Sequence, residues 1–234
     1  LHAEILRDIA ARSTPPVPLI QGRIESRYRY NPTFESIYAI VPGVPPMLLI
    51  LIPAILMAVS VAREKELGSI ISFYVPLAAR LEFLAGRQVP YVAIGFMNFL
   101  LLTAMSIVVF QVPLKGSASA LAVGAFLYVM ATTGMGLLIS TFTSSQIAAI
   151  FATAILTMAP TIHFSGFMQP VSTLEGAARV LGTFWPTTYY LHLSTGAFTK
   201  GLSARDLSSD LLALAAFVPV FIAVGTLCLR RQAR

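Results

Sequence analysis

The sequence predicts an all-α protein that crosses a membrane several times, and two observations predict it. First, 56% of the 234 residues are hydrophobic and only 11% are charged, whereas a soluble domain carries roughly 25% charged residues. A soluble fold of this size cannot hide so much apolar surface, because too much of the chain stays at the surface. Second, charge is absent from runs long enough to cross a bilayer, namely residues 36–62, 88–114, 116–174 and 211–229.

Each charge-free run predicts one membrane-spanning helix, except that 116–174 predicts two. A helix needs about 20 apolar residues to cross roughly 30 Å of hydrocarbon. We therefore expect five spans near residues 44–62, 90–111, 119–140, 146–164 and 208–229. The short polar stretch 141–146 makes the third and fourth spans an antiparallel hairpin. Pro53 lies inside the first span and should kink it unless neighbours satisfy the carbonyl that it frees.

The positions of Lys and Arg predict which connections face the cytoplasm. Basic residues gather in residues 63–88 and in the C-terminal tail, as Arg63, Lys65, Arg80, Arg87, Arg230, Arg231 and Arg234. The connection 112–118 carries only Lys115. We therefore expect 63–88 and the tail to be cytoplasmic, and 165–207 to be external.

The arginine-rich segment 1–31 fits this topology if it ends a larger external domain, because long translocated domains largely escape the rule. If it were a free cytoplasmic tail, the topology would invert. The chain begins at Leu1 and opens on no signal peptide. We expect an upstream part to be missing, residues 1–35 to end an external domain and enter the membrane, and residues 36–234 to form the transmembrane domain.

Residues 63–89 are long for a simple connection and mix both signs of charge. Arg63, Glu64, Lys65 and Glu66 open the segment, and an amphipathic run that includes Phe73 follows. This pattern is typical of a short helix lying along the membrane interface. Both charge signs favour a protein partner over anionic lipid, which attracts Lys and Arg alone. The simpler alternative is a solvated loop with snorkelling charges.

The same segment resembles the cytoplasmic coupling helix of ABC-2 type permeases. The resemblance rests on Arg-Glu-Lys-Glu at 63–66, Gly68-Ser69, Pro76, Glu82, Gly86-Arg87 and Pro90-Tyr91, in the family's order and spacing. Ser69, Ile71 and Arg87 replace the usual Thr, Glu and Lys, and Ile71 removes one charge from the expected ATPase contact. The amino-acid sequence is most similar to the permease portion of ribosome-associated ATPase-type proteins, in which ATP-binding cassettes and permease share one polypeptide.

The resemblance implies an ABC-2, type V exporter-like transmembrane domain, with five spans visible of an expected six. It implies an ABC ATPase as partner, separate or fused, which binds ATP and Mg, and a second permease half. This chain has no G-x-x-x-x-G-K-[ST] motif and is expected to bind no cofactor itself. The implied ATPase-coupling residues are Arg63, Glu64, Lys65, Glu66, Gly68, Ser69, Phe73, Pro76, Glu82 and Gly86.

No predicted span contains Asp, Glu, Lys or Arg in its interior. Transporters driven by protons or sodium usually keep a charged residue at mid-membrane, so the sequence disfavours that class. It favours an external energy source and a hydrophobic or amphipathic cargo, drug-like or lipid-like. The polar residues expected to line a pathway are Asn98, Thr103, Thr132, Thr133, Thr153 and Thr157.

Segment 165–207 interleaves aromatic residues with Gly and Pro, including Trp185, Tyr190 and Phe198. Aromatic residues of this kind are typical of the membrane interface. We expect a partly re-entrant pair of short helices at the outer surface, with a gate or release site as the alternative. His163 is a candidate proton or metal site or, more simply, a polar anchor. No His or Cys pair has metal-ligand spacing, so no metal site is assigned.

These observations favour the permease subunit of an ATP-driven exporter in the bacterial inner membrane. The alternative is a membrane scaffold that anchors an ATPase or a ribosome-associated factor without moving a solute. The excess of Lys and Arg is explained by their place in the connections between spans, and the sequence has no soluble basic face. Direct nucleic-acid binding is therefore not expected.

Overall fold

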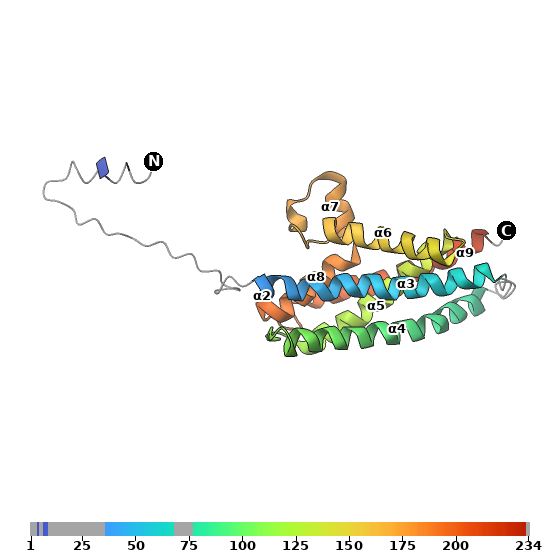
Figure 1. Ribbon diagram of the computed structural model, residues 1–234, viewed down its shortest axis with the longest axis horizontal. Coiled ribbons are helices and arrows are strands. Elements are labelled where there is room, and N and C mark those ends of the chain that lie inside the picture. The colour runs from blue at the N-terminus through green and yellow to red at the C-terminus, as the bar shows by residue number, and fades with distance from the viewer. Residues whose placement is uncertain (1–3, 5–6, 9–35, 68–76, 233–234) are drawn as a thin grey trace. The chain divides into compact units, whose positions relative to one another are not determined.

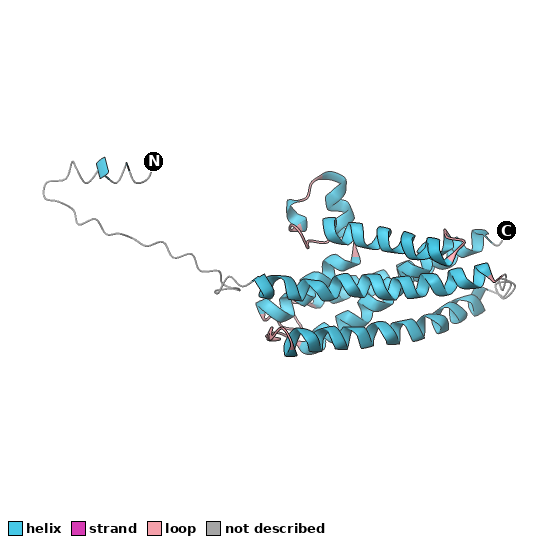
Figure 2. Cartoon of the chain, in the orientation of Figure 1, coloured by secondary structure: helices cyan, strands magenta, loops and turns pink. Residues whose placement is uncertain are grey.

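The structure is a computed structural model that describes residues 4, 7–8, 36–67 and 77–232. The chain divides into two compact units, Leu1–Pro32 and Thr33–Arg234. The second unit holds the helical bundle (Figures 1 and 2). Five of its helices are long and apolar enough to cross a membrane. The predicted all-α fold class is therefore confirmed in the described residues.

The five long helices are α3 (Val44–Glu66), α4 (Leu77–Val108), α5 (Ala118–Thr141), α6 (Gln146–Phe164) and α9 (Ser208–Gln232). Helix α2 (Ser36–Ile40) and a 3-10 turn (Val41–Gly43) lead directly into α3. Helices α5 and α6 begin where a serine hydroxyl accepts a hydrogen bond from a backbone N–H, Ser117 from Ala120 (3.2 Å) and Ser145 from Ala148 (3.1 Å). Such caps satisfy donors that the first turn of a helix leaves open.

The bundle has two inner helices and three outer ones. About half of the most apolar stretch of α3 and two thirds of that of α5 are buried (50% and 67%), against 22% for α4, 22% for α6 and 17% for α9. Gly136 lets α5 approach α3 closely, because a Cβ there would lie 2.2 Å from the carbonyl oxygen of Ala54. The outer helices present exposed apolar side chains such as Met97, Phe151 and Leu212, which suit lipid as solvent.

Helix α4 begins earlier than the sequence predicts. Its first residue is Leu77, and the helix runs without a break through Pro90, where the sequence placed the start of the second span. Residues 77–89 are thus continuous with the span and do not form a separate interfacial helix. A proline removes one backbone hydrogen bond, but neighbouring helices allow a membrane helix to continue past it.

Segment 165–207 contains α7 (Gly176–Thr183), α8 (Pro186–Thr195), a 3-10 turn (Val171–Thr173) and a π-helical turn, η4 (Gly196–Lys200). Helix α8 packs on α3, α5 and α9 inside the bundle, so it is more deeply embedded than a helix that lies on the membrane surface. Tyr190 and Phe198 are 0% and 2% exposed, so they belong to the core. Phe184 and Met168 are exposed, as interfacial aromatic and apolar side chains are expected to be.

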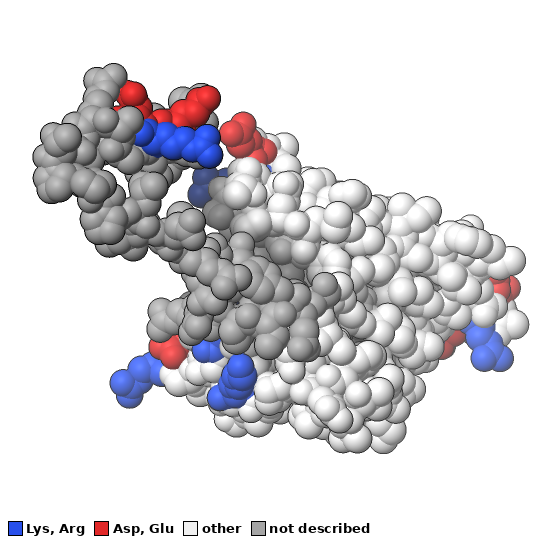
Figure 3. Space-filling model, turned by 60° about the vertical axis from the view of Figure 1, so that its left-hand side comes forward, with Lys and Arg blue, Asp and Glu red and all other residues white. Residues whose placement is uncertain are grey.

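The long helices run between two ends of the bundle (Figure 1). The "α3–α4 end" holds Glu66, the turn 141–146 and the C-terminal end of α9. The "opposite end" holds the connection 109–117, which meets η4 through hydrogen bonds from the N–H groups of Lys115 and Gly116 to the carbonyl of Ala197 (3.1 and 2.7 Å). On the face of the bundle drawn in Figure 3, charged side chains gather at the ends and leave an uncharged surface between them.

Candidate functional site

The last turn of α3 carries the Arg-Glu-Lys-Glu run at the α3–α4 end. The helix ends at Glu66, and the N–H of Leu67 closes its last turn on the carbonyl of Arg63 (3.0 Å). Helical geometry spreads four consecutive side chains around the axis. Glu64, Lys65 and Glu66 therefore leave α3 in different directions and meet three different helices.

Glu64 pairs with Arg87 of α4. The Nη1 of Arg87 donates to the Glu64 carboxylate, while its Nη2 donates to the carbonyl oxygen of Ser60 (2.7 Å) and to the Ser60 hydroxyl (2.8 Å). The Arg87 side chain is 14% exposed and that of Glu64 is 35% exposed. A guanidinium can make several such bonds at once because its donors form a rigid planar fork. Arg87 thus fixes the start of the second span against the end of the first.

Lys65 closes the C-terminal end of α5. Its Nζ donates to the carbonyl oxygens of Ser140 (2.6 Å), Thr141 (3.0 Å) and Thr143 (3.1 Å). The last carbonyl groups of a helix have no partner within the helix. They also form the negative end of its dipole, which favours a nearby cation. Lys65 therefore supplies hydrogen-bond donors to the last carbonyls of α5 and places a positive charge at the negative end of its dipole.

Glu66 meets the N-terminal end of α6. Its carboxylate accepts hydrogen bonds from the backbone N–H of Gln146 (2.8 Å) and from the Gln146 side-chain amide (2.5 Å). The N-terminal end of a helix is positive and favours an anion. The carboxylate therefore lies where the dipole of α6 stabilises it.

Together these side chains join the ends of α3, α4, α5 and α6 at the α3–α4 end. Glu64, Lys65 and Glu66, which are expected to contact the ATPase, have partners within the chain, and their role in ATPase coupling stays a prediction. Arg63 is exposed, as are the apolar Leu67 and Phe142. With Glu66, which is exposed although it bonds to Gln146, these residues form part of the surface that remains for a partner in this part of the described chain.

The other predicted coupling residues are only partly described. Gly68, Ser69, Phe73 and Pro76 lie outside the described residues, as does the side chain of Glu82, whose backbone is in α4. Gly86 lies in α4, is exposed, and has open space where a Cβ would stand. Their role in ATPase coupling stays a prediction.

Sequence reasoning assigned no structural role to Arg87 and missed Ser60 and Gln146, which complete this cluster. The sequence did contain a sign of the role of Arg87, because it is the one basic residue directly after the glycine of the coupling pattern. Gln146 had a weaker signal, since it follows the N-cap residue Ser145 and starts a helix. Ser60 had none, because a lone serine in an apolar helix is common.

The predicted pathway residues lie on three helices, α4, α5 and α6. Thr132, Thr133, Thr153 and Thr157 are fully buried, while Asn98 and Thr103 are half-buried. The hydroxyls of Thr132, Thr133 and Thr157 donate to carbonyls of their own helices, as buried threonines in helices often do. Gln88 of α4 adds a bond to the Thr133 hydroxyl (2.5 Å). Their role in a transport pathway stays a prediction.

A chain of neutral hydrogen bonds crosses the interior nearer the opposite end. Trp185 Nε1 donates to the hydroxyl of Thr161 (2.9 Å), which lies 3.3 Å from the hydroxyl of Thr187. The Thr187 hydroxyl is 2.8 Å from the Tyr128 oxygen, which is 2.9 Å from the carbonyl of Pro46. A carbonyl only accepts, so Tyr128 donates to Pro46 and accepts from Thr187. This chain links α8, α6, α5 and α3.

Tyr128 also stacks on Tyr190 of α8, with ring centroids 4.5 Å apart. The two side chains are fully buried. The Tyr190 hydroxyl has no hydrogen-bond partner among the described residues. His163 is exposed at the end of α6, and the described residues hold no group of three His, Cys, Asp or Glu side chains that could bind a metal.

Comparison with known proteins gives one consistent result. The sequence profile described as "ABC-2 family transporter protein" matches residues 5–227. The chain is 31% identical to the Escherichia coli K12 "Probable multidrug ABC transporter permease YbhS", over 92% of this chain and 56% of that protein. It is 27% identical to the E. coli K12 "Probable multidrug ABC transporter permease YbhR", over 78% of this chain and 48% of that protein. It is 22% identical to the E. coli K12 "Inner membrane transport permease YhhJ", over 99% of this chain and 61% of that protein. The chain therefore spans about half the length of the curated relatives it matches.

Proposed function

Because the chain belongs to the ABC-2 family of transporter proteins, we propose that it forms the membrane-spanning permease part of an ATP-driven exporter. It is a multi-pass protein of the inner membrane, with five apolar spans. An ABC ATPase, either separate or fused to the same polypeptide, binds ATP and Mg and supplies the energy. A fused ATPase is the arrangement that the resemblance to ribosome-associated ATPase-type proteins implies. A second permease half completes the pathway.

The proposed cargo is a hydrophobic or amphipathic molecule. Between their charged end turns, the described spans have apolar or neutral interior side chains, and the buried polar residues there are mainly Thr, Ser and Gln. Such an interior offers no fixed charge for binding an ion. Two of the relatives carry "multidrug" in their names, which supports a drug-like cargo over a lipid-like one.

The joined helix ends at the α3–α4 end carry this proposal. A partner that pushes on α3 or on the connection after Leu67 also pushes on α5 through Lys65, on α6 through Glu66, and on α4 through Arg87. Packed helices change position as rigid bodies and not by continuous deformation. The motor therefore needs to contact only a small part of this exposed surface, such as Arg63 or Leu67, in order to move the ends of four helices.

The test is transport by the full-length protein with its ATPase in liposomes, with ATP hydrolysis and movement of a fluorescent lipophilic drug measured in parallel. Lys65→Met breaks the bond between α3 and α5, so we expect ATP hydrolysis to continue while drug movement falls severalfold. Lys115→Met is the matched control, because it removes one lysine from the opposite end, where the side chain is exposed.

Two results would count against the proposal. If the drug stimulates hydrolysis but never crosses the bilayer in the wild type, the chain is a scaffold for the ATPase. If Lys65→Met transports as well as Lys115→Met does, the joined helix ends play no part in coupling.

A further inference from the structure

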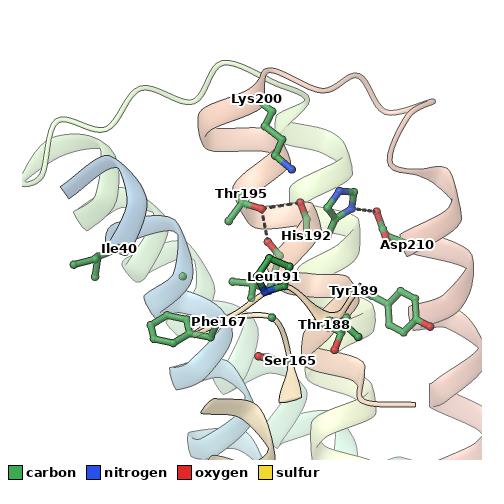
Figure 4. A pocket seen from close by; sticks show the side chains of 14 residues that line it. Ile40, Ser165, Phe167, Thr188, Tyr189, Leu191, His192, Thr195, Lys200 and Asp210 are labelled. Atoms are coloured by element: carbon green, nitrogen blue, oxygen red, sulfur yellow. Dashed lines mark hydrogen bonds and ion pairs between the residues drawn. The ribbon is translucent and has the colours of Figure 1, made fainter. Parts of the chain in front are cut away.

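A cavity of about 620 Å³ lies at the opposite end of the bundle. Its walls come from the entry to the first span, the loop 165–171, α8, η4 and the first turn of α9 (Figure 4). Pockets that bind small molecules in proteins have volumes of about 300–1,000 Å³. The cavity is therefore large enough for a drug-sized molecule or for the head group and part of the chain of an amphipath.

The cavity has an apolar side and a polar side. Figure 4 shows Ile40 and Phe167 on one side, and Lys200, His192 and Asp210 on the other. Pro170 and Val171 extend the apolar side. A ligand that satisfies both sides has an apolar body and a charged or strongly polar head.

The cavity-lining side chains with unused hydrogen-bond donors are basic. Asp210 is a residue of only 8% exposure, and its Oδ2 lies 2.7 Å from Nδ1 of His192. The side chain of His192 is 49% exposed, against 11% for Asp210. The carboxylate thus orients the imidazole and is largely covered, while the imidazole is presented to the cavity. Its Nε2 has no hydrogen bond to any described residue.

Lys200 adds an ammonium group on the same side. Its side chain is exposed, and the structure gives it no hydrogen bond or ion pair with the described residues. Lys115 is close by, because its Cβ would lie 3.6 Å from a Cβ added at Gly201. The nearby Asp206 is turned to its own loop, where it accepts hydrogen bonds from the Ser203 N–H (3.0 Å) and hydroxyl (2.7 Å).

We propose that this cavity binds the anionic head group of an amphipath, a carboxylate or a phosphate, between Lys200 and His192, with the apolar body against Phe167. Ammonium and imidazole donors make charge-assisted hydrogen bonds to such oxygens. The proposal concerns binding alone and holds whether or not the chain moves a solute.

The experiment measures binding of a fluorescent C16 fatty acid to the full-length protein in nanodiscs of neutral lipid. The methyl ester of the same probe removes the charge and keeps the body, so we expect it to bind about tenfold more weakly. Competition with unlabelled fatty acid and with lysophosphatidic acid distinguishes a free carboxylate from a lipid phosphate head group. Competition by either one supports the proposal.

Variants then place the site. Lys200→Met should weaken the acid about tenfold and leave the ester unchanged, whereas Phe167→Ala should weaken both probes. Arg205→Met is the control, since it removes a cation from the same exposed loop but does not line the cavity. Thermal melting of each variant separates lost binding from lost folding, and the acid-to-ester comparison needs no variant.

The proposal is overturned if acid and ester bind the wild type equally, or if Arg205→Met weakens the acid as much as Lys200→Met does. It is also overturned if a quaternary ammonium amphipath binds more tightly than the acid.

Discussion

The two ends of the bundle use their charged residues differently. At the α3–α4 end, Lys65, Glu66 and Arg87 make bonds within the chain and join helix ends. At the opposite end, neutral hydrogen bonds through Tyr128 and Thr187 join the helices. There the Lys200 ammonium group and the His192 imidazole face a cavity.

This difference separates mechanical from binding roles. A charge whose bonds are all made within the chain can transmit force but has little left to offer a ligand. A charge such as Lys200, which faces a cavity and has no bond to the described residues, can bind a ligand but holds no helices together. The predictions below test this division, from the largest expected effect to the smallest.

Lys65→Met should destabilise the protein most, by about 2 kcal/mol, because hydrogen bonds to charged groups are worth about 1.5–3 kcal/mol. The variant also leaves the C-terminal carbonyls of α5 without their cation. The measurement is thermal unfolding in detergent, followed by circular dichroism. Lys115→Met should unfold at the wild-type temperature, and equal effects of the two variants would contradict the division.

Tyr128→Phe and Tyr190→Phe are matched variants, because each removes one hydroxyl from the same pair of stacked rings. The first removes a hydroxyl that joins Pro46 to Thr187, and should cost about 1 kcal/mol, since hydrogen bonds between membrane helices are worth up to about 1.7 kcal/mol. The second removes a buried hydroxyl without a described partner, so stability should stay the same or rise. The same unfolding assay compares them. A larger loss for Tyr190→Phe than for Tyr128→Phe would show that the neutral chain does not hold this end.

Arg87→Lys keeps the positive charge and restores the residue that is usual in ABC-2 permeases. It keeps an ion pair with Glu64 but loses the fork that also binds Ser60. We expect a loss of about 0.7 kcal/mol in thermal unfolding, within the range for one neutral hydrogen bond. Ser60→Ala should give a similar loss, and the double variant should lose no more than either single one. Additive losses would mean that Arg87 and Ser60 act independently.

Gly86→Ala should have the smallest effect and the opposite sign. A Cβ at this position meets no atom within 4 Å, and we expect a gain of about 0.5 kcal/mol, the lower end of the preference for alanine over glycine inside a helix. The permease alone should therefore be slightly stabilised. If Gly86 contacts the ATPase, as the family resemblance implies, the variant should also weaken assembly with the ATPase in a pull-down titration. Unchanged assembly would remove Gly86 from the coupling surface.

The sequence alone predicts most of the helical framework. The fourth predicted span, 146–164, coincides with α6, because Ser145 caps its start and polar residues bound the apolar run. The start of α4 was misplaced because Pro90 and Tyr91 gave a strong local signal, whereas the continuation of the helix depends on neighbouring helices. The burial of α8 was missed because the aromatic residues of the interface and of a core look alike in composition.

The site was only half visible from the sequence. The Arg-Glu-Lys-Glu run was identified, but its partners were not, because Lys65 binds backbone carbonyls at residues 140–143. Every residue carries such a carbonyl, so no side-chain pattern marks these acceptors. The cavity at the opposite end was equally hidden, since it brings together residues from Ile40 to Asp210 that only the tertiary fold makes neighbours.

The most direct test of the central claim is a distance measurement between α3 and the α5–α6 turn during the ATPase cycle. Leu67 and Phe142 are 68% and 75% exposed, so both accept a spin label after replacement by cysteine. Cys228, the one cysteine of these 234 residues, is changed to serine first. Electron paramagnetic resonance on the complex with its ATPase then compares the nucleotide-free and ATP-bound states. We predict the same Leu67–Phe142 distance in both states, and a changed, broader distribution in Lys65→Met. A distance that changes between the two states in the otherwise wild-type protein would contradict the claim that these helix ends move as one body.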